Sequence, residues 1–324
     1  MKIAIIGAGF SGCNLYNNLK EKYENITIFE KSRGVGGRLS TKYIEDKFID
    51  HGTSSLIPIT DDLKFFCLDL AKNGVLKAKY DEFIPKTGIN SICKFLIDEK
   101  DLQTNTKITK AKNINNKWIL EDENNVIYED FDLLFIAIPA PQITQIQIEL
   151  PNEFKEKLSC IKYDSIFSLI LYSKEDIKLN ENKIYENIDV KDIINNSKKY
   201  LYKDFSSYVI HSSKEFANCV NERSKEEIYD IFLDNFDDEI KEGIENFIQI
   251  PHLWKYAHAK NSLDMPYFLN EEKNLGICGD YFNHSNIEAS LSSSELLSKR
   301  FIWKVITKSI ISYLFIKWYS YDTI

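Results

Sequence analysis

KIAIIGAGFSG, residues 2–12, opens the chain and decides its fold. The apolar run that ends in Gly7 is typical of a buried parallel strand. The pattern Gly7-x-Gly9-x-x-Gly12 follows at once, and the sequence Cys13 to Glu21 favours a helix. A strand, a glycine turn and a helix in this order predict the start of a βαβ unit.

A second apolar run, NITIFE, ends in Glu30 and predicts the next strand. In such units the first glycine permits a tight turn, the second lets the backbone approach a pyrophosphate, and the third lets helix and strand pack closely. The helix N-terminus attracts the anion, and an acidic residue at the position of Glu30 accepts hydrogen bonds from a ribose 2′-OH. The pattern therefore predicts dinucleotide binding, with Phe10, Ser11 and Lys31 as further candidates.

Composition narrows the class of protein. The chain has 324 residues, 44% of them hydrophobic, and a formal net charge of −8. The length suits two domains, and the acidic balance argues against nucleic-acid binding, which requires neutralisation of phosphates. None of the six cysteines forms a CxxC pair, so we expect no metal site and free thiols in a cytoplasmic protein.

The order of predicted elements indicates an α/β fold with a discontinuous Rossmann-type domain. We assign residues 1–50, 85–145 and 257–300 to this dinucleotide-binding domain, since the apolar runs DLLFIAI and LGICG should return to its sheet. Residues 51–84 and 146–256 alternate strand-like and helical patterns. They predict a second, α+β substrate domain on a mixed or antiparallel sheet.

The segment KSRGVGGRLS, residues 31–40, places glycines and two arginines directly after Glu30. Glycines let a loop lie close to a ligand, and arginines pair with phosphate oxygens. At this point the chain resembles the flavin amine oxidase superfamily, whose pattern is GxGxxG, an acidic residue and a GGR loop. The resemblance implies FAD as the cofactor.

Further segments resemble renalase-like flavoproteins, in order and at suitable spacing from residue 2 to about residue 300. They are FIDHG at 48–52, AIPAPQ at 137–142, HLWKYA at 252–257, GICGD at 276–280 and Ile287-Glu288. The resemblance implies a two-domain FAD enzyme that transfers a hydride from a small amine or dihydronicotinamide-type substrate to the flavin. O2 would then reoxidise the flavin and give H2O2.

The resemblance also implies roles for single residues. Gly37 and Arg38 would line the flavin side of the cofactor, the backbone of Ile108 would meet adenine, and Gly279 and Asp280 would lie at the ribityl and pyrophosphate groups. The helix after Ile287 would direct its positive end toward the flavin. We interpret Cys278 as a buried thiol, so FAD would be bound non-covalently.

For the substrate pocket we select His252, Trp254 and Tyr256, because alternate residues of a strand share one face. The competing interpretation is that these aromatic residues belong to the core and that His252 is structural. For His51, next to Gly52, the choice between a role in the pocket and a structural role is equally open.

Two departures from the family pattern leave alternatives open. Thr53-Ser54-Ser55-Leu56 replaces an expected small residue, Gln, Tyr and Phe, and the segments 286–290 and 293–294 lack two glycines and an arginine of the family. The alternatives are an FAD-dependent desaturase or isomerase that acts on a lipid-like substrate, and a catalytically altered flavin-binding protein.

Residues 301–324 form an apolar, aromatic tail interrupted by lysines. The uncharged run from Ser309 to Ile316 is too short to span a bilayer. We expect a terminal helix that packs on the domain or on a partner subunit. An interfacial membrane helix and a disordered tail are the less favoured alternatives.

Overall fold

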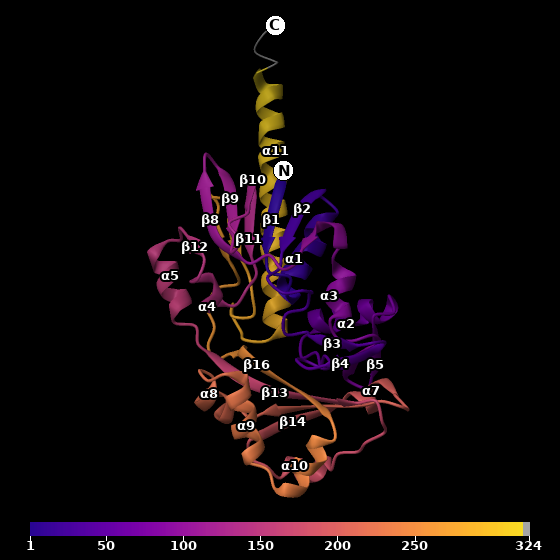
Figure 1. The fold of residues 1–324 in the computed structure, drawn as a ribbon. Coiled ribbons are helices and arrows are strands. Elements are labelled where there is room, and N and C mark those ends of the chain that lie inside the picture. Colours follow the sequence, from indigo (N-terminus) through magenta and orange to yellow (C-terminus); the bar gives the residue numbers. More distant parts are fainter. Residues whose placement is uncertain (320–324) are drawn as a thin grey trace.

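A computed structural model describes the backbone of residues 1–319 and the side chains as far as residue 303. Its centre is a six-stranded sheet in the order β17-β18-β11-β1-β2-β7 (Figure 1). The strands are β1 Lys2–Ile6, β2 Asn25–Phe29, β7 Leu102–Gln103, β11 Leu133–Ile136, β17 Phe268–Asn270 and β18 Leu275–Ile277. β1 pairs in parallel with β2 and β11, and β18 joins β11 in parallel, so the two late apolar runs do return to this sheet.

Side chains of β1 alternate between two hydrophobic cores. Ile3 and Ile5 face a core formed with the helices α1, α2, α3 and α11, whereas Ala4 and Ile6 face a core formed with a second, four-stranded sheet and with α4 and α5. Because both faces of the central sheet are covered, its inner strands are apolar throughout. The helices are α1 Phe10–Lys20, α2 Asp61–Lys72, α3 Ser91–Leu96, α4 Ala140–Ile143, α5 Asn152–Ser159 and α11 Ile287–Tyr319.

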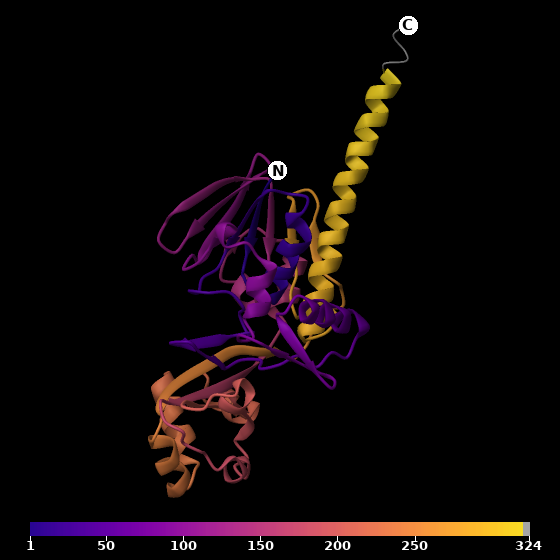
Figure 2. The same cartoon turned by 90° about the vertical axis from the view of Figure 1, so that its right-hand side faces the viewer.

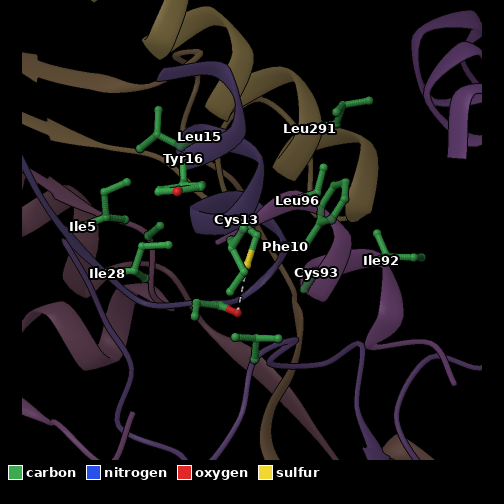
Figure 3. Packing of buried hydrophobic residues seen from close by; sticks show 14 of the residues in the cluster. Ile5, Phe10, Cys13, Leu15, Tyr16, Ile28, Ile92, Cys93, Leu96 and Leu291 are labelled. Carbon is green, nitrogen blue, oxygen red and sulfur yellow. Dashed lines mark hydrogen bonds between the residues drawn. The ribbon is translucent and has the colours of Figure 1, made fainter. Parts of the chain in front are cut away.

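The helix α1 fills the space between the central sheet, α3 and α11 (Figure 3). It begins at Phe10, earlier than the expected Cys13, so Gly12 lies in its first turn. The Cys13 thiol donates a hydrogen bond to the carbonyl oxygen of Ala8 at 3.3 Å, which ties the helix to the glycine turn.

The four-stranded sheet that covers the other face has the order β10-β9-β8-β12. Two hairpins, β3–β4 and β5–β6, form two-stranded sheets of their own. A short 3-10 helix, η1 Glu99–Asp101, precedes β7. The bounds of these strands are β3 Thr41–Ile44, β4 Lys47–Asp50, β5 Leu76–Lys79, β6 Glu82–Pro85, β8 Ile108–Ile114, β9 Lys117–Asp122, β10 Ile127–Phe131 and β12 Gln147–Ile148.

A separate antiparallel sheet, in the order β14-β15-β13-β16, lies below the central sheet in Figure 1. Phe167, Leu169 and Leu253 pack against helices on one face, whereas Ile170 and Val209 meet Ile49 of the β3–β4 hairpin on the other. The bounds are β13 Tyr163–Ser173, β14 Val190–Asn195, β15 Ser206–Ser212, β16 Ile248–Ala259, α6 Glu181–Tyr185, α7 Asn196–Tyr200, α8 Lys214–Val220, α9 Lys225–Asp234 and α10 Asp238–Glu245. The predicted fold class, a Rossmann-type α/β domain with a second α+β part, is confirmed.

The last helix, α11, is longer than expected. The helix expected after Ile287 and the terminal helix expected within residues 301–324 are one element, because α11 continues without a break to Tyr319. Its C-terminal part extends beyond the rest of the molecule in Figure 2. Phe301 and Ile302, the first residues of the predicted tail, pack against the core of the central sheet. The side chains after residue 303 lie outside the described residues, as do residues 320–324. Among the helices that the structure describes, none is both long and apolar enough to cross a bilayer.

Candidate functional site: a dinucleotide cradle beside an aromatic wall

The glycine turn is closely packed on one side and open on the other. Gly7 has a φ of +102°, and a Cβ there would lie 2.6 Å from the carbonyl oxygen of Ala137. A Cβ on Gly12 would lie 1.9 Å from the carbonyl oxygen of Gly7. At Gly9, by contrast, a Cβ would meet nothing within 4 Å. The turn therefore leaves free space beside Gly9, at the N-terminus of α1, where a pyrophosphate would need it.

Glu30 lies directly after β2 and is 8% exposed. Its carboxylate accepts hydrogen bonds from the backbone N–H groups of Ala8 at 2.9 Å and Ser32 at 2.8 Å. A carboxylate offers about four acceptor positions, so Glu30 keeps the capacity to accept ribose hydroxyl groups. Its neighbour Lys31 is exposed, and Ile108 is buried at the start of β8.

The glycine–arginine loop lies against the glycine turn. Gly36 donates its N–H to the carbonyl oxygen of Ala8 at 2.9 Å and forms a β-bridge with Gly9. A Cβ on Gly37 would lie 3.3 Å from the Cα atom of Gly9. Two glycine-rich segments thus form one continuous backbone surface, and this arrangement fits a bound dinucleotide that extends from Glu30 past Gly9.

Arg38 connects this loop to the distant end of the chain. Its Nη1 atom donates to Asp280 Oδ2 at 2.6 Å and to the carbonyl oxygen of Ala257 at 3.2 Å. Asp280 is 5% exposed, and the adjacent Gly279 donates its N–H to Ser293 Oγ at 3.3 Å. Burial alone would lower the pKa of Arg38, but the Asp280 carboxylate raises it above its usual value. Arg38 therefore stays charged, and its ion pair with Asp280 fixes the two segments to each other.

Tyr163, at the start of β13, also contacts this pair, because its hydroxyl group lies 3.5 Å from Asp280 Oδ1. Burial and the Asp280 charge raise the pKa of Tyr163, so the phenol remains protonated and can donate. Tyr163 was not among the site residues predicted from the sequence. Its only signal was its place at the start of a long apolar run.

The predicted pocket residues are carried by β16, where His252 pairs with Ser168 and Trp254 with Ile166. The rings of His252 and Trp254 lie 4.3 Å apart. His51 completes the group, with its ring 5.3 Å from His252 and 5.5 Å from Trp254. We call these three residues the aromatic wall.

Hydrogen bonds fix the aromatic wall. Trp254 Nε1 donates to the carbonyl oxygen of His51 at 3.1 Å and to Ser168 Oγ at 3.0 Å. Ser40 Oγ lies 3.2 Å from His51 Nε2. Burial lowers the pKa of His51 to about 4, and burial together with the nearby His51 lowers that of His252 to about 3. Both imidazoles are therefore neutral at physiological pH.

Tyr256 is separated from the aromatic wall. The β13–β16 ladder shifts its register between Asp164 and Ile166, so residues 255–257 form a bulge. The strand alternation on which the predicted common face depended is interrupted there. The Tyr256 ring instead lies 5.6 Å from that of Tyr163.

A cleft of about 390 Å³ opens beside Tyr163 and Tyr256. This volume lies within the range of roughly 300–1,000 Å³ typical of small-molecule sites. Its other lining residues are Pro141, Thr144, Leu158, Ser159, Ile161, Lys162, Ser165, Asn221 and Lys255.

The first turn of α11 carries the remaining predicted residues. Ile287 packs against the core that the central sheet forms with α1, α2, α3 and α11. The Glu288 carboxylate accepts hydrogen bonds from the N–H groups of Ile59 and Thr60 at 2.6 and 3.1 Å. Cys278 is fully buried, and burial raises the pKa of its thiol to about 12. Such a thiol is protonated and unreactive at neutral pH.

The segments that depart from the family pattern have structural roles of their own. Ser294 Oγ accepts a hydrogen bond from the buried side-chain amide of Asn14 at 2.9 Å, and Ser293 accepts one from Gly279. Leu56 is buried and pairs with Phe83. Within the part of the chain whose side chains are described, no group of His, Cys, Asp and Glu residues could hold a metal ion.

Comparison with known proteins agrees with this geometry. Residues 5–67 match the family model of the NAD(P)-binding Rossmann-like domain. Renalase of Mus musculus is 22% identical over 331 residues, which cover 90% of this chain and 96% of that protein.

Two solved structures have the same fold. A fatty acid isomerase from P. acnes that produces CLA has a TM-score of 0.62 at 13% identity, covering 93% of this chain and 98% of its own. A double mutant of putrescine oxidase has a TM-score of 0.62 at 11% identity, and the match covers 94% of this chain and 99% of that protein. The predicted resemblance to renalase-like flavoproteins is therefore confirmed, and it supports an FAD-dependent oxidoreductase that uses FAD as its cofactor.

Proposed function

We propose that this chain is an FAD-dependent oxidoreductase that takes a hydride from a small amine or dihydronicotinamide-type substrate. The observation that carries the proposal is the convergence of Gly9, Gly36 and the Arg38–Asp280 pair on one surface. Gly9, Gly36 and Arg38 come from the first forty residues and Asp280 from the last fifty, and a dinucleotide such as FAD that extends from Glu30 past Gly9 would lie along this surface.

The chain supplies binding and orientation. Glu30 accepts the adenosine ribose hydroxyl groups, the turn from Gly7 to Gly12 holds the pyrophosphate, and Arg38 holds the flavin end. Bound FAD supplies the hydride acceptor, and O2 is the oxidant that we expect to regenerate it as H2O2 is released. Residues 1–50, 85–145 and 257–300 would form the FAD-binding domain together with α2 and α5, which pack against the two cores of the central sheet and not, as predicted, with the second domain. The antiparallel sheet and its helices would form the substrate domain.

The aromatic wall gives a neutral, partly buried surface for a planar substrate. Because His51 and His252 are uncharged at neutral pH, they neither repel a cation nor bind an anion strongly. His252 and Trp254 would position the substrate ring.

One experiment tests the reaction. The purified holoprotein is mixed anaerobically with small amines and with dihydronicotinamide isomers, and flavin absorbance is followed. We expect one substrate class to bleach the flavin and O2 to restore it with release of H2O2. Trp254→Phe should slow the bleaching, whereas the control Trp303→Phe, at a side chain 69% exposed, should not. A flavin that none of these compounds reduces would refute the proposed reaction.

A second function is favoured by one observation, the similarity of the fold to a fatty acid isomerase. Isomerisation of a lipid-like substrate would involve no net oxidation, whereas its desaturation would still need an acceptor such as O2 to reoxidise the flavin. Product analysis after incubation with unsaturated fatty acids distinguishes the two, because an isomerised product without H2O2 supports only the second.

The free cysteines suit the cytoplasmic location that we propose.

A further inference from the structure

Asp50, at the end of β4, is a fully buried carboxylate beside the aromatic wall. Its partner is Lys199 of α7, whose side chain is 9% exposed. The Lys199 ammonium group donates both to Asp50 Oδ2 and to the carbonyl oxygen of Ser54. The helix α7, which follows β14 of the antiparallel sheet, therefore holds residues 50–54, which begin at the last residue of β4.

The carboxylate of Asp50 has no free acceptor position. Thr41 Oγ1 and the N–H group of Ile89 donate to Oδ1 at 2.6 and 2.8 Å, and the Tyr200 hydroxyl group donates to Oδ2 at 2.5 Å. With Lys199 this fills the four positions that a carboxylate offers. Burial lowers the pKa of Lys199, and the Asp50 charge opposes this shift.

The backbone of Asp50 is held by the same helix. Its N–H group donates to Asn196 Oδ1 at 3.0 Å, and Asn196 Nδ2 donates to its carbonyl oxygen at 3.3 Å. Both side-chain and backbone atoms of Asp50 are thus bound to α7, so their position relative to the antiparallel sheet is fixed.

One residue further along the chain, His51 transmits this constraint to the aromatic wall. The His51 carbonyl oxygen accepts hydrogen bonds from Trp254 Nε1 and from His211 Nε2, each at 3.1 Å. A displacement of Asp50 would therefore move the acceptor of the Trp254 indole group and the ring that faces it.

A buried ion pair is costly to desolvate, and apolar residues often stabilise a fold as well or better. Such pairs are best explained where they specify one arrangement among several. Here the ion pair would specify how the β3–β4 hairpin lies against the antiparallel sheet, and these two sheets meet at the aromatic wall.

We propose that Lys199 and Asp50 are positioning residues that set the geometry of the aromatic wall, and so of the substrate pocket. The part of this proposal that concerns substrate rests on the proposed function, whereas the part that concerns Trp254 does not. Lys199 touches neither the cofactor surface nor the aromatic wall and acts through Asp50 and His51.

The test is the indole N–H resonance of Trp254 in 15N-tryptophan-labelled holoprotein, assigned with Trp254→Phe. Two variants are compared with the wild type, namely Lys199→Met and the paired Asp50→Asn/Lys199→Met, which leaves no unpaired buried charge. The control Lys183→Met removes a lysine from an ion pair with Asp237 and Glu239, far from Asp50 in the chain. Thermal midpoints are recorded for all proteins.

We expect Lys199→Met to shift the Trp254 resonance and to speed its exchange with D2O at a temperature where the protein is fully folded. The Trp118 indole group, which donates to the carbonyl oxygen of Lys273, should stay unchanged, and Lys183→Met should change neither. If Lys199→Met does not fold, the paired variant decides by the same measurement. A lower thermal midpoint with an unchanged Trp254 resonance would overturn the proposal, because the pair would then only stabilise the fold. This outcome is independent of whether the wild type reduces its flavin.

Discussion

Replacement of Gly9 by serine should separate cofactor binding from folding. Gly9 is the N-cap residue of α1, has extended backbone angles and makes no side-chain cap. Because a Cβ at this position meets nothing within 4 Å, Gly9→Ser brings no clash in the free protein. Serine is a favoured N-cap, so the free energy of unfolding of the apoprotein should stay constant or rise by about 0.3 kcal/mol.

The same side chain would occupy the space that a pyrophosphate needs and would bind the N–H groups that should face it. Overpacking of this kind costs about 1–3 kcal/mol, which corresponds to roughly a 5- to 140-fold weaker affinity for FAD. The matched control is Gly12→Ser, whose Cβ would lie 1.9 Å from a backbone oxygen and should destabilise the apoprotein itself.

The assay combines urea unfolding of the apoproteins with titration of FAD followed by flavin fluorescence. We expect Gly9→Ser to lose affinity without loss of stability and Gly12→Ser to lose stability. Unchanged FAD affinity in Gly9→Ser would refute the assignment of this space to the pyrophosphate.

Three further results are expected. Glu30→Gln should weaken FAD binding by about 1.5–3 kcal/mol, the value of a hydrogen bond to a charged group, as measured by the same titration; an unchanged affinity would exclude Glu30 from the ribose site. Arg38→Met should lower the free energy of unfolding of the apoprotein by about 2 kcal/mol. This loss is smaller than the ~3–5 kcal/mol expected for a fully buried pair, because the Arg38 side chain is 34% exposed. Urea unfolding checks it, with Asp280→Asn as the reciprocal variant. Because the folded-state pKa values of His51 and His252 are lowered to about 4 and 3, the unfolded chain binds more protons below about pH 6.5, so stability should fall as the pH drops from 6.5 toward 4. Replacement of both histidines by glutamine should flatten this dependence in urea unfolding at a series of pH values, and an equally steep loss would assign it to other groups.

The backbone geometry of the glycine turn could be predicted from the sequence. The turn from Gly7 to Gly12 and the place of Glu30 follow from short-range geometry, because a tight turn between strand and helix demands glycine at fixed positions. The return of residues 133–136 to the central sheet also follows, since a continuous apolar run requires burial on both faces.

Contacts between distant residues could not be predicted in this way. Lys199 and Asp50 are 149 residues apart, and nothing in the sequence marks this lysine among the 41 basic residues of the chain. Strand alternation predicted that Tyr256 shares a face with Trp254. This alternation is interrupted by a bulge, and no residue pattern in the sequence indicates that bulge. Tyr163 acquires its contact with Asp280 only from the packing of β13 near the end of β18.

The most direct test of the account is the binding of FAD to the purified chain. Apoprotein prepared by removal of any bound flavin is titrated with FAD, FMN and NAD. We predict that FAD binds in equimolar amount, gives a yellow protein and raises the thermal midpoint, and that FMN binds less tightly because it lacks the adenosine that would reach Glu30. A protein that stays colourless after addition of FAD, or that binds FMN as tightly as FAD, would contradict the proposed role of the glycine turn and Glu30.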